Sequence, residues 1–223
     1  MLFEKNQRIV FMGDSVTDFG RMRPIGEGLH DGVGTGYVRV IHSMINGFYP
    51  ELGLRISNMG ISGNNILDLE KRWQSDCLEL KPDWVSICIG INDVWRFFDS
   101  PDIYDLHVSE EVYEKTYRKI IEKTKPIVKG IILMTPYYME PEKNDSMRAK
   151  MDVYGGIVKK LSEEYNCISI DTQLVFDKYL KLRHSSFVAW DRVHPNHVGA
   201  LLIANEFLKK TGFDYERMSK FIK

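Results

Sequence analysis

The chain has 223 residues, with 30 lysines and arginines against 31 aspartates and glutamates, and a formal net charge of -1. Its 43% hydrophobic and 27% charged residues are ordinary for a globular protein and argue against disorder. The near-neutral charge excludes a broad basic surface for nucleic acid, and no apolar stretch approaches the ~18 residues that a membrane span needs. We therefore expect one domain over residues 1–223, with neither nucleic acid nor a membrane as partner.

The N-terminus and the cysteines both favour a cytoplasmic location. Residues 1–8 lack the basic segment, the apolar segment and the small-residue cleavage site of a secretory signal. The three cysteines, Cys77, Cys88 and Cys167, are odd in number, far apart and without a C-x-x-C pair. Such a set fits unpaired thiols in a reducing compartment better than a disulfide framework.

Short apolar runs alternate with longer amphipathic ones along the chain. The short runs predict strands at residues 9–12, 55–58, 84–89, 130–134 and 168–170. The amphipathic stretches predict helices, among them one with apolar positions from 112 to 124, one over about 145–165, and a last one that Asn196 can cap. This alternation predicts an α/β protein with a mostly parallel five-stranded sheet and helices on both faces.

Polar turns follow the first three predicted strands, and a fourth precedes the last helix. They are Gly-Asp-Ser-Val-Thr at 13–17, Gly-Ile-Ser-Gly-Asn at 60–64, Gly-Ile-Asn-Asp at 90–93 and Trp-Asp-Arg-Val-His-Pro at 190–195. In parallel sheets ligands bind outside the carboxyl ends of the strands, so we expect these turns to lie together around a site.

These turns carry the residue types of nucleophilic catalysis. Ser15 needs a base to take its proton; His194 can do so, with Asp191 three residues earlier to orient the ring. The backbone N–H groups of Ser15 and Gly63 and the side chain of Asn92 could hold a tetrahedral oxyanion. Taken singly, each residue has a purely structural explanation as a cap, a turn or a loop histidine. Their convergence on one edge of the sheet favours the catalytic interpretation.

The Gly-Asp-Ser of residues 13–15, with Gly63, Asn92 and the Asp-x-x-His of residues 191–194, resembles the four blocks of the SGNH (GDSL-type) hydrolases. The resemblance implies a three-layer α/β/α sandwich around a flavodoxin-like parallel sheet, and a serine esterase that works without a metal or cofactor. It also implies that the serine is the nucleophile, the histidine the general base and acid, and the aspartate the orienting acid. The family is named for a Gly-Asp-Ser-Leu motif, and this chain has Val16 in place of the leucine. One apolar residue replaces another there, so the change concerns packing.

Longer segments are similar to the intracellular bacterial acetylxylan esterases of this superfamily. These segments are residues 13–21, 34–38, 81–87, 90–96, 129–136 and 190–195. The similarity implies an acetylated sugar as substrate and a homo-oligomeric state. Aromatic residues near the C-terminus, expected to be exposed, also favour an oligomer; they are Phe213, Tyr215 and Phe221.

Residues near the predicted catalytic turns suggest how a sugar could bind. Trp95 and Trp190 stand close in sequence to Asn92 and His194, so both could flank the site and stack on a sugar ring. Arg21, in a polar segment just after the nucleophile, is a further candidate for substrate binding. The chain has no long apolar insertion to cover an acyl chain, which favours a short acyl group on a hydrophilic alcohol.

Two other functions stay open: a lysophospholipase or thioesterase acting on longer acyl chains, and a catalytically inactive carbohydrate-binding protein. Other signals are weak. The glycine-rich segment 32–36 lacks a nucleotide-binding pattern, and the His-x-x-His of 194–197 has no acidic or cysteine partner at the spacing of metal ligands. A glycosidase pair made of Asp14 and Asp191 would leave Ser15 unexplained. We therefore expect neither cofactor nor metal.

Overall fold

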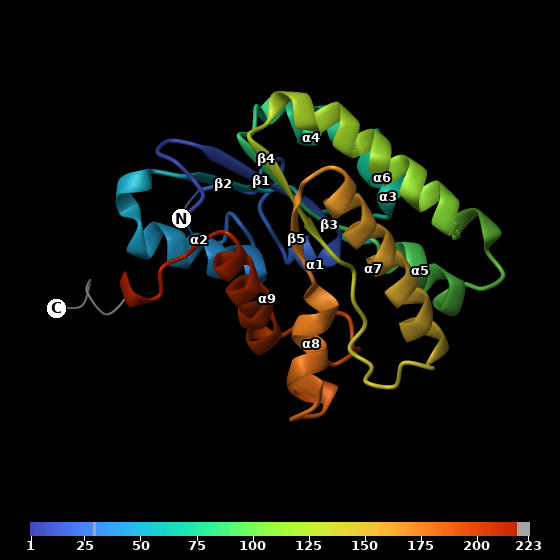
Figure 1. Ribbon diagram of the computed structural model, residues 1–223. Coiled ribbons are helices and arrows are strands. Elements are labelled where there is room, and N and C mark those ends of the chain that lie inside the picture. Colours follow the sequence, from blue (N-terminus) through green and yellow to red (C-terminus); the bar gives the residue numbers. More distant parts are fainter. Residues whose placement is uncertain (29, 218–223) are drawn as a thin grey trace.

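Five parallel strands form the centre of the computed structural model, which describes residues 1–28 and 30–217 (Figure 1). Their order is β2-β1-β3-β4-β5, and every neighbouring pair is parallel. The strands are β1 Arg8–Gly13, β2 Arg55–Asn58, β3 Trp84–Cys88, β4 Gly130–Met134 and β5 Ile168–Ile170. They match the predicted runs closely; the third ends at Cys88, one residue before the predicted end.

The α-helices fill the intervals between the strands. In chain order they are α1 Ser15–Asp18, α2 Tyr37–Phe48, α3 Ile66–Lys71, α4 Trp73–Asp76, α5 Ile91–Asp99, α6 Glu110–Thr124, α7 Ser146–Glu164, α8 Thr172–Leu180 and α9 His197–Lys210. The predicted cap of the last helix is confirmed, because the Asn196 side chain accepts hydrogen bonds from the backbone of Val198 and Gly199. Helix α7 runs through Gly155 and Gly156 without a break.

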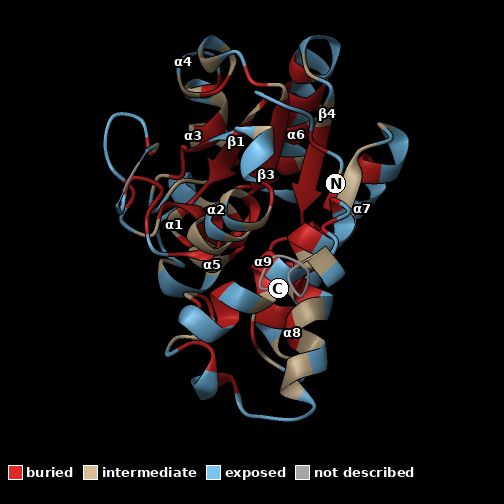
Figure 2. Ribbon diagram, turned by 90° about the vertical axis from the view of Figure 1, so that its left-hand side faces the viewer, coloured by how far each residue is buried: buried red, intermediate tan, exposed pale blue. Residues whose placement is uncertain are grey.

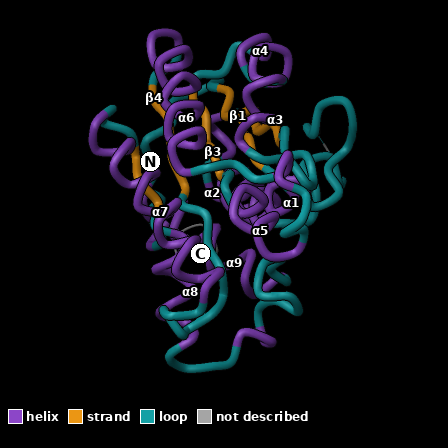
Figure 3. Tube along the Cα trace, turned by 90° about the vertical axis from the view of Figure 1, so that its right-hand side faces the viewer, coloured by secondary structure: helices purple, strands orange, loops and turns teal. Residues whose placement is uncertain are grey.

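The helices cover both faces of the sheet, as the sequence predicted (Figures 1 and 3). Helices α2 and α9 pack together on one face, where the ring of Phe11 from β1 contacts the rings of Tyr37 and Phe207. On the other face helix α6 packs against both α3 and α7. The strands between these layers are almost wholly buried (Figure 2). The result is a three-layer α/β/α sandwich.

One expectation about the C-terminal aromatic residues is wrong. Phe213 is buried, at 6% exposed, because its ring packs against that of Tyr49 at a centroid distance of 5.3 Å. Tyr215 is 40% exposed, and Phe221 lies outside the described residues. The aromatic surface inferred from the sequence is therefore smaller than expected.

The strand register brings three polar turns to one edge of the sheet. Phe11 pairs with Asn58, and Gly13, the last residue of β1, pairs with Cys88, the last residue of β3. The chain therefore leaves β1, β2 and β3 at nearly the same level and in the same direction.

Candidate active site

A cleft of about 780 Å³ opens at the carboxyl ends of these strands. Its lining includes six of the predicted site residues: Ser15, Gly63, Asn92, Trp95, Trp190 and His194. The structure thus brings residues from four distant turns to one surface, as the sequence predicted for the turns.

Ser15, His194 and Asp191 form a continuous hydrogen-bonded chain. Ser15 Oγ lies 2.7 Å from His194 Nε2, and His194 Nδ1 lies 2.5 Å from Asp191 Oδ2. The other carboxylate oxygen of Asp191 accepts the backbone N–H groups of Val193, at 3.0 Å, and of His194, at 2.7 Å. The carboxylate is therefore fixed from both sides, and the ring it holds faces the serine hydroxyl.

The hydrogen bonds to Asp191 also set its charge state. Burial by itself raises the pKa of this carboxyl, but the hydrogen bonds from the His194 ring and from the two backbone N–H groups outweigh burial. The net pKa lies below the usual value, so Asp191 is a carboxylate at neutral pH. A carboxylate at this position stabilises a positive charge on the imidazole.

The turn before Ser15 is shaped by Gly13 and Asp14. A Cβ on Gly13 would stand 2.4 Å from the carbonyl oxygen of Cys88, so only glycine lets β1 approach β3 this closely. Asp14 then caps α1 by accepting the backbone N–H of Val16. Ser15 is the first residue of α1, where a backbone N–H has no partner within the helix. Its hydroxyl and its N–H consequently both lie at the start of a helix.

Two further hydrogen-bond donors line the cleft near the serine. Gly63 has φ of +82°, a left-handed conformation that favours glycine, and a Cβ there would meet no other atom within 4 Å. Asn92 is 3% exposed and belongs to the first turn of α5. Its Nδ2 donates to the carbonyl oxygen of Asn64 at 3.0 Å, which leaves one of its two N–H bonds for another acceptor.

Two buried carboxyl groups, Asp14 and Asp93, are the sequence neighbours of Ser15 and Asn92. Both are fully buried, and burial raises the pKa of each to about 7. Asp93 accepts the backbone N–H of Ile66, the first residue of α3. Asp14 caps α1 and is not part of the hydrogen-bonded chain from Ser15 through His194 to Asp191.

The two predicted tryptophans flank His194. Trp190 is 86% exposed, and its ring is nearly parallel to the imidazole, with 13° between the planes and 6.4 Å between centroids. Trp95 is partly buried, and its ring lies 5.9 Å from the imidazole on a tilted plane. Both therefore present indole surface to the cleft.

Arg21 does not join them. Its side chain is buried, and the residue is 5% exposed, because the guanidinium donates to the backbone carbonyls of Gly60, Met22 and Pro24. It is not among the residues that line the cleft. Arg21 therefore braces the loop that follows the nucleophile, and the expectation that it binds substrate is corrected accordingly.

The structure adds lining residues that the sequence analysis missed. They are Phe19, Gly20, Thr35, Ser62, Arg96 and Asp99. Two of these could have been found, since Arg96 and Asp99 follow Asn92 by four and seven residues, the spacing that places residues on one face of a helix. Thr35 and Ser62 lie in loops whose path carries no such periodicity.

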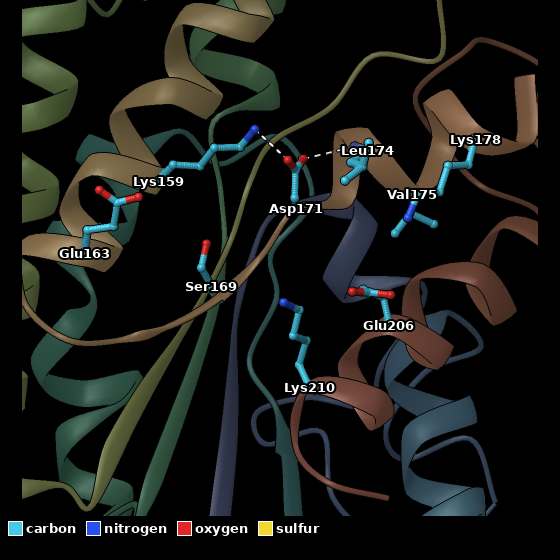
Figure 4. Close-up of a pocket in the computed structure, with 9 residues that line it drawn as sticks. All are labelled: Lys159, Glu163, Ser169, Asp171, Leu174, Val175, Lys178, Glu206 and Lys210. Carbon is cyan, nitrogen blue, oxygen red and sulfur yellow. Dashed lines mark hydrogen bonds and ion pairs between the residues drawn. The ribbon is translucent and has the colours of Figure 1, made fainter.

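A second cavity, of about 220 Å³, lies between α7, β5, α8 and α9, away from the cleft (Figure 4). Lysines and acidic residues from these elements line it, and Lys159 forms an ion pair with Asp171. Neither histidine nor cysteine is among the described residues that line it. Within the described residues no three His, Cys, Asp or Glu side chains gather as metal ligands would.

In the part of the chain that the structure describes, no helix is both long enough and apolar enough to span a bilayer.

The fold and the cleft place this chain in a known class of hydrolases. Residues 11–202 match the model of the GDSL-like lipase/acylhydrolase family, so the chain belongs to that family.

Individual relatives are similar over almost the whole length. An acetylxylan esterase from Geobacillus stearothermophilus is 48% identical over 217 residues, which cover 97% of this chain and 99% of that protein. Its crystal structure matches with a TM-score of 0.95, over 96% of this chain and 98% of that one. An alpha/beta hydrolase from the metagenome of Lake Arreo, Spain, matches with a TM-score of 0.94, 48% identity and the same coverage.

Further structures of the Geobacillus esterase carry alanine in place of a serine, an aspartate or a histidine, and are described as structures of catalytic mutants.

Proposed function

We propose that this protein is a serine esterase that removes O-acetyl groups from acetylated xylo-oligosaccharides. The observation that carries the proposal is the hydrogen-bonded chain from Ser15 through His194 to Asp191, which ends in an open cleft beside hydrogen-bond donors. The similarity to an acetylxylan esterase at 48% identity supports the substrate class.

In the proposed mechanism His194 Nε2 takes the proton of Ser15 Oγ as the oxygen attacks the ester carbonyl. The carbonyl π electrons move to its oxygen, which is held by the N–H groups of Ser15 and Gly63 and by the Asn92 side chain. Collapse of this intermediate breaks the bond to the sugar oxygen, which receives the proton from His194. Water then repeats the sequence on the acetyl-enzyme, releasing acetate and restoring the Ser15 hydroxyl.

The lining of the cleft favours a short acyl group on a hydrophilic alcohol. Thr35, Ser62, Arg96 and Asp99 supply polar groups, while the exposed Trp190 offers a flat apolar surface of the kind that stacks on a sugar ring. A site for a long acyl chain would need a continuous apolar wall to take up the methylene groups.

The experiment is acetate release from acetylated xylo-oligosaccharides, followed by proton NMR, alongside a chain-length series of para-nitrophenyl esters. We expect rapid loss of sugar acetyl groups, loss of ~10⁶ in kcat in Ser15→Ala, and falling activity beyond about four acyl carbons. Hydrolysis of aryl acetate without hydrolysis of sugar acetates would contradict the substrate assignment. Faster turnover of long-chain esters would favour a lysophospholipase or thioesterase.

The inactive carbohydrate-binding alternative makes a separate prediction. A fluorophosphonate should label Ser15 in the wild type, because His194 activates its hydroxyl, and should leave Ser15→Ala unlabelled. Wild-type protein that resists labelling would favour a binding protein.

Three further expectations stay predictions from the sequence: a cytoplasmic location, a homo-oligomeric state, and a single domain over residues 1–223. The free cysteines Cys77, Cys88 and Cys167 support the first. Sedimentation of the purified protein would test the second, and limited proteolysis the third.

A further inference from the structure

The Asn92 side chain is held at both ends of its amide. Its Nδ2 donates to the backbone carbonyl of Asn64 at 3.0 Å, and its Oδ1 accepts from Nη2 of Arg96 at 2.9 Å. A carbonyl oxygen can only accept, and a guanidinium can only donate. The two partners therefore allow a single orientation of the amide, because the flipped amide would set donor against donor and acceptor against acceptor.

Arg96 is itself fixed in place. Its Nη1 forms an ion pair with Asp99 in the same helix, three residues later, and its guanidinium lies 5.8 Å from the centroid of the Trp95 ring. Its side chain is 27% exposed on the wall of the cleft, so solvent screens the pair only in part. The four-residue spacing between Asn92 and Arg96 brings the two side chains onto one face of α5.

The orientation of this amide matters for the chemistry. With Nδ2 toward the cleft, Asn92 offers a donor to an oxyanion; with Oδ1 there, it would offer a partial negative charge. A cation on Oδ1 also draws electron density from the amide, which makes the remaining N–H a stronger donor, since hydrogen bonds in a chain polarise one another.

We propose that Arg96, braced by Asp99, is a positioning residue that orients and polarises Asn92 as an oxyanion donor. The inference rests on the proposed function, because it requires Asn92 to act on the developing oxyanion. It adds the side chain that decides which atom of Asn92 faces the reacting carbonyl.

The test is a double-mutant cycle on para-nitrophenyl acetate hydrolysis, with Arg96→Met, Asn92→Ala and the double variant. We expect Arg96→Met to lower kcat by roughly 10- to 100-fold, less than the ~10²–10³ that removal of an oxyanion donor costs, with KM nearly unchanged. In the Asn92→Ala background the same substitution should lower kcat less than threefold, since its target is gone. Arg96→Lys, which keeps a cationic donor, should recover part of the lost kcat.

A matched control is Arg118→Met, because the Arg118 side chain is about equally exposed, at 28%, and pairs with Glu114 and Glu164, which do not line the cleft. It should leave kcat unchanged. Thermal unfolding of every variant identifies any loss of fold, and Arg96→Lys supplies the comparison if Arg96→Met does not fold.

Equal losses of kcat from Arg96→Met in both backgrounds, or a loss confined to KM, would overturn the proposal while leaving the esterase function intact. Wild-type kcat in Asn92→Ala would overturn it as well. Activity that survives in Ser15→Ala would instead overturn the proposed function itself.

Discussion

Replacing Asp191 by asparagine tests the proposed mechanism without changing the shape of the side chain. Oδ1 of Asp191 accepts two backbone N–H groups, at 3.0 and 2.7 Å, and Oδ2 faces Nδ1 of His194. An asparagine carbonyl would keep the place of Oδ1, because turning the amide round would leave two N–H groups unsatisfied at about 1–3 kcal/mol each. The orientation with the –NH₂ group facing the histidine is therefore favoured over the flipped one by at least about 2 kcal/mol, a population ratio of roughly 30.

That orientation places the histidine in the wrong tautomer. Nδ1 must then accept the amide hydrogen, so the ring proton sits on Nε2, the nitrogen that lies against Ser15 Oγ and should take its proton. The unfavourable tautomer by itself should lower kcat roughly 30-fold. Loss of the carboxylate opposite the developing imidazolium adds to this, and the total should approach the ~10⁴ known for this change in a serine-protease triad.

The assay is steady-state hydrolysis of para-nitrophenyl acetate, with kcat and KM measured separately and the unfolding temperature recorded. We expect kcat to fall by ~10⁴, with KM and the unfolding temperature near wild type. Asp102→Asn, the same chemical change at an exposed residue, is the matched control and should behave as wild type. A folded Asp191→Asn variant that keeps more than a tenth of the wild-type kcat would refute the reasoning.

Three other predictions concern stability and substrate binding. Burial raises the pKa of Asp93 from 3.8 to about 7, so the folded protein keeps a proton that the unfolded chain releases, and the free energy of unfolding falls as pH rises from about 4 to about 7. In urea unfolding, the free energy of unfolding of Asp93→Asn, relative to that of the wild type, should rise by about 2.6 kcal/mol between pH 5 and pH 8, because only the part of the shift above pH 5 falls in this range; parallel pH profiles would contradict this. Gly63→Ala should lower the free energy of unfolding by about 1–2 kcal/mol, because φ is +82°, and should lower kcat; an unchanged unfolding curve would contradict the strain. Trp190→Ala should change the unfolding free energy by less than about 0.5 kcal/mol, since the residue is 86% exposed. It should raise KM for acetylated xylo-oligosaccharides and leave KM for para-nitrophenyl acetate unchanged; equal effects on both substrates would argue against sugar stacking.

The sequence determined the strands and the edge at which the site forms. Parallel strands buried on both faces are nearly continuous apolar runs, so β3 and β4 stand out without any tertiary information. The turns after β1, β2 and β3 must meet because parallel strands end at a common edge. A local pattern therefore predicted a long-range arrangement, including the approach of Ser15 to residues far along the chain.

Other features depended on packing between distant segments. The local sequence gives no sign that Arg21 and Phe213 are buried. The guanidinium of Arg21 is enclosed by backbone carbonyls of the loops at residues 22–24 and 60. The ring of Phe213 is covered by that of Tyr49. The orientation of the Asn92 amide likewise depends on Asn64, which comes from a different turn. Periodicity and motif spacing report the faces of single elements. Which surfaces meet across the sheet, and which polar groups then satisfy one another, is decided only when the whole chain has packed.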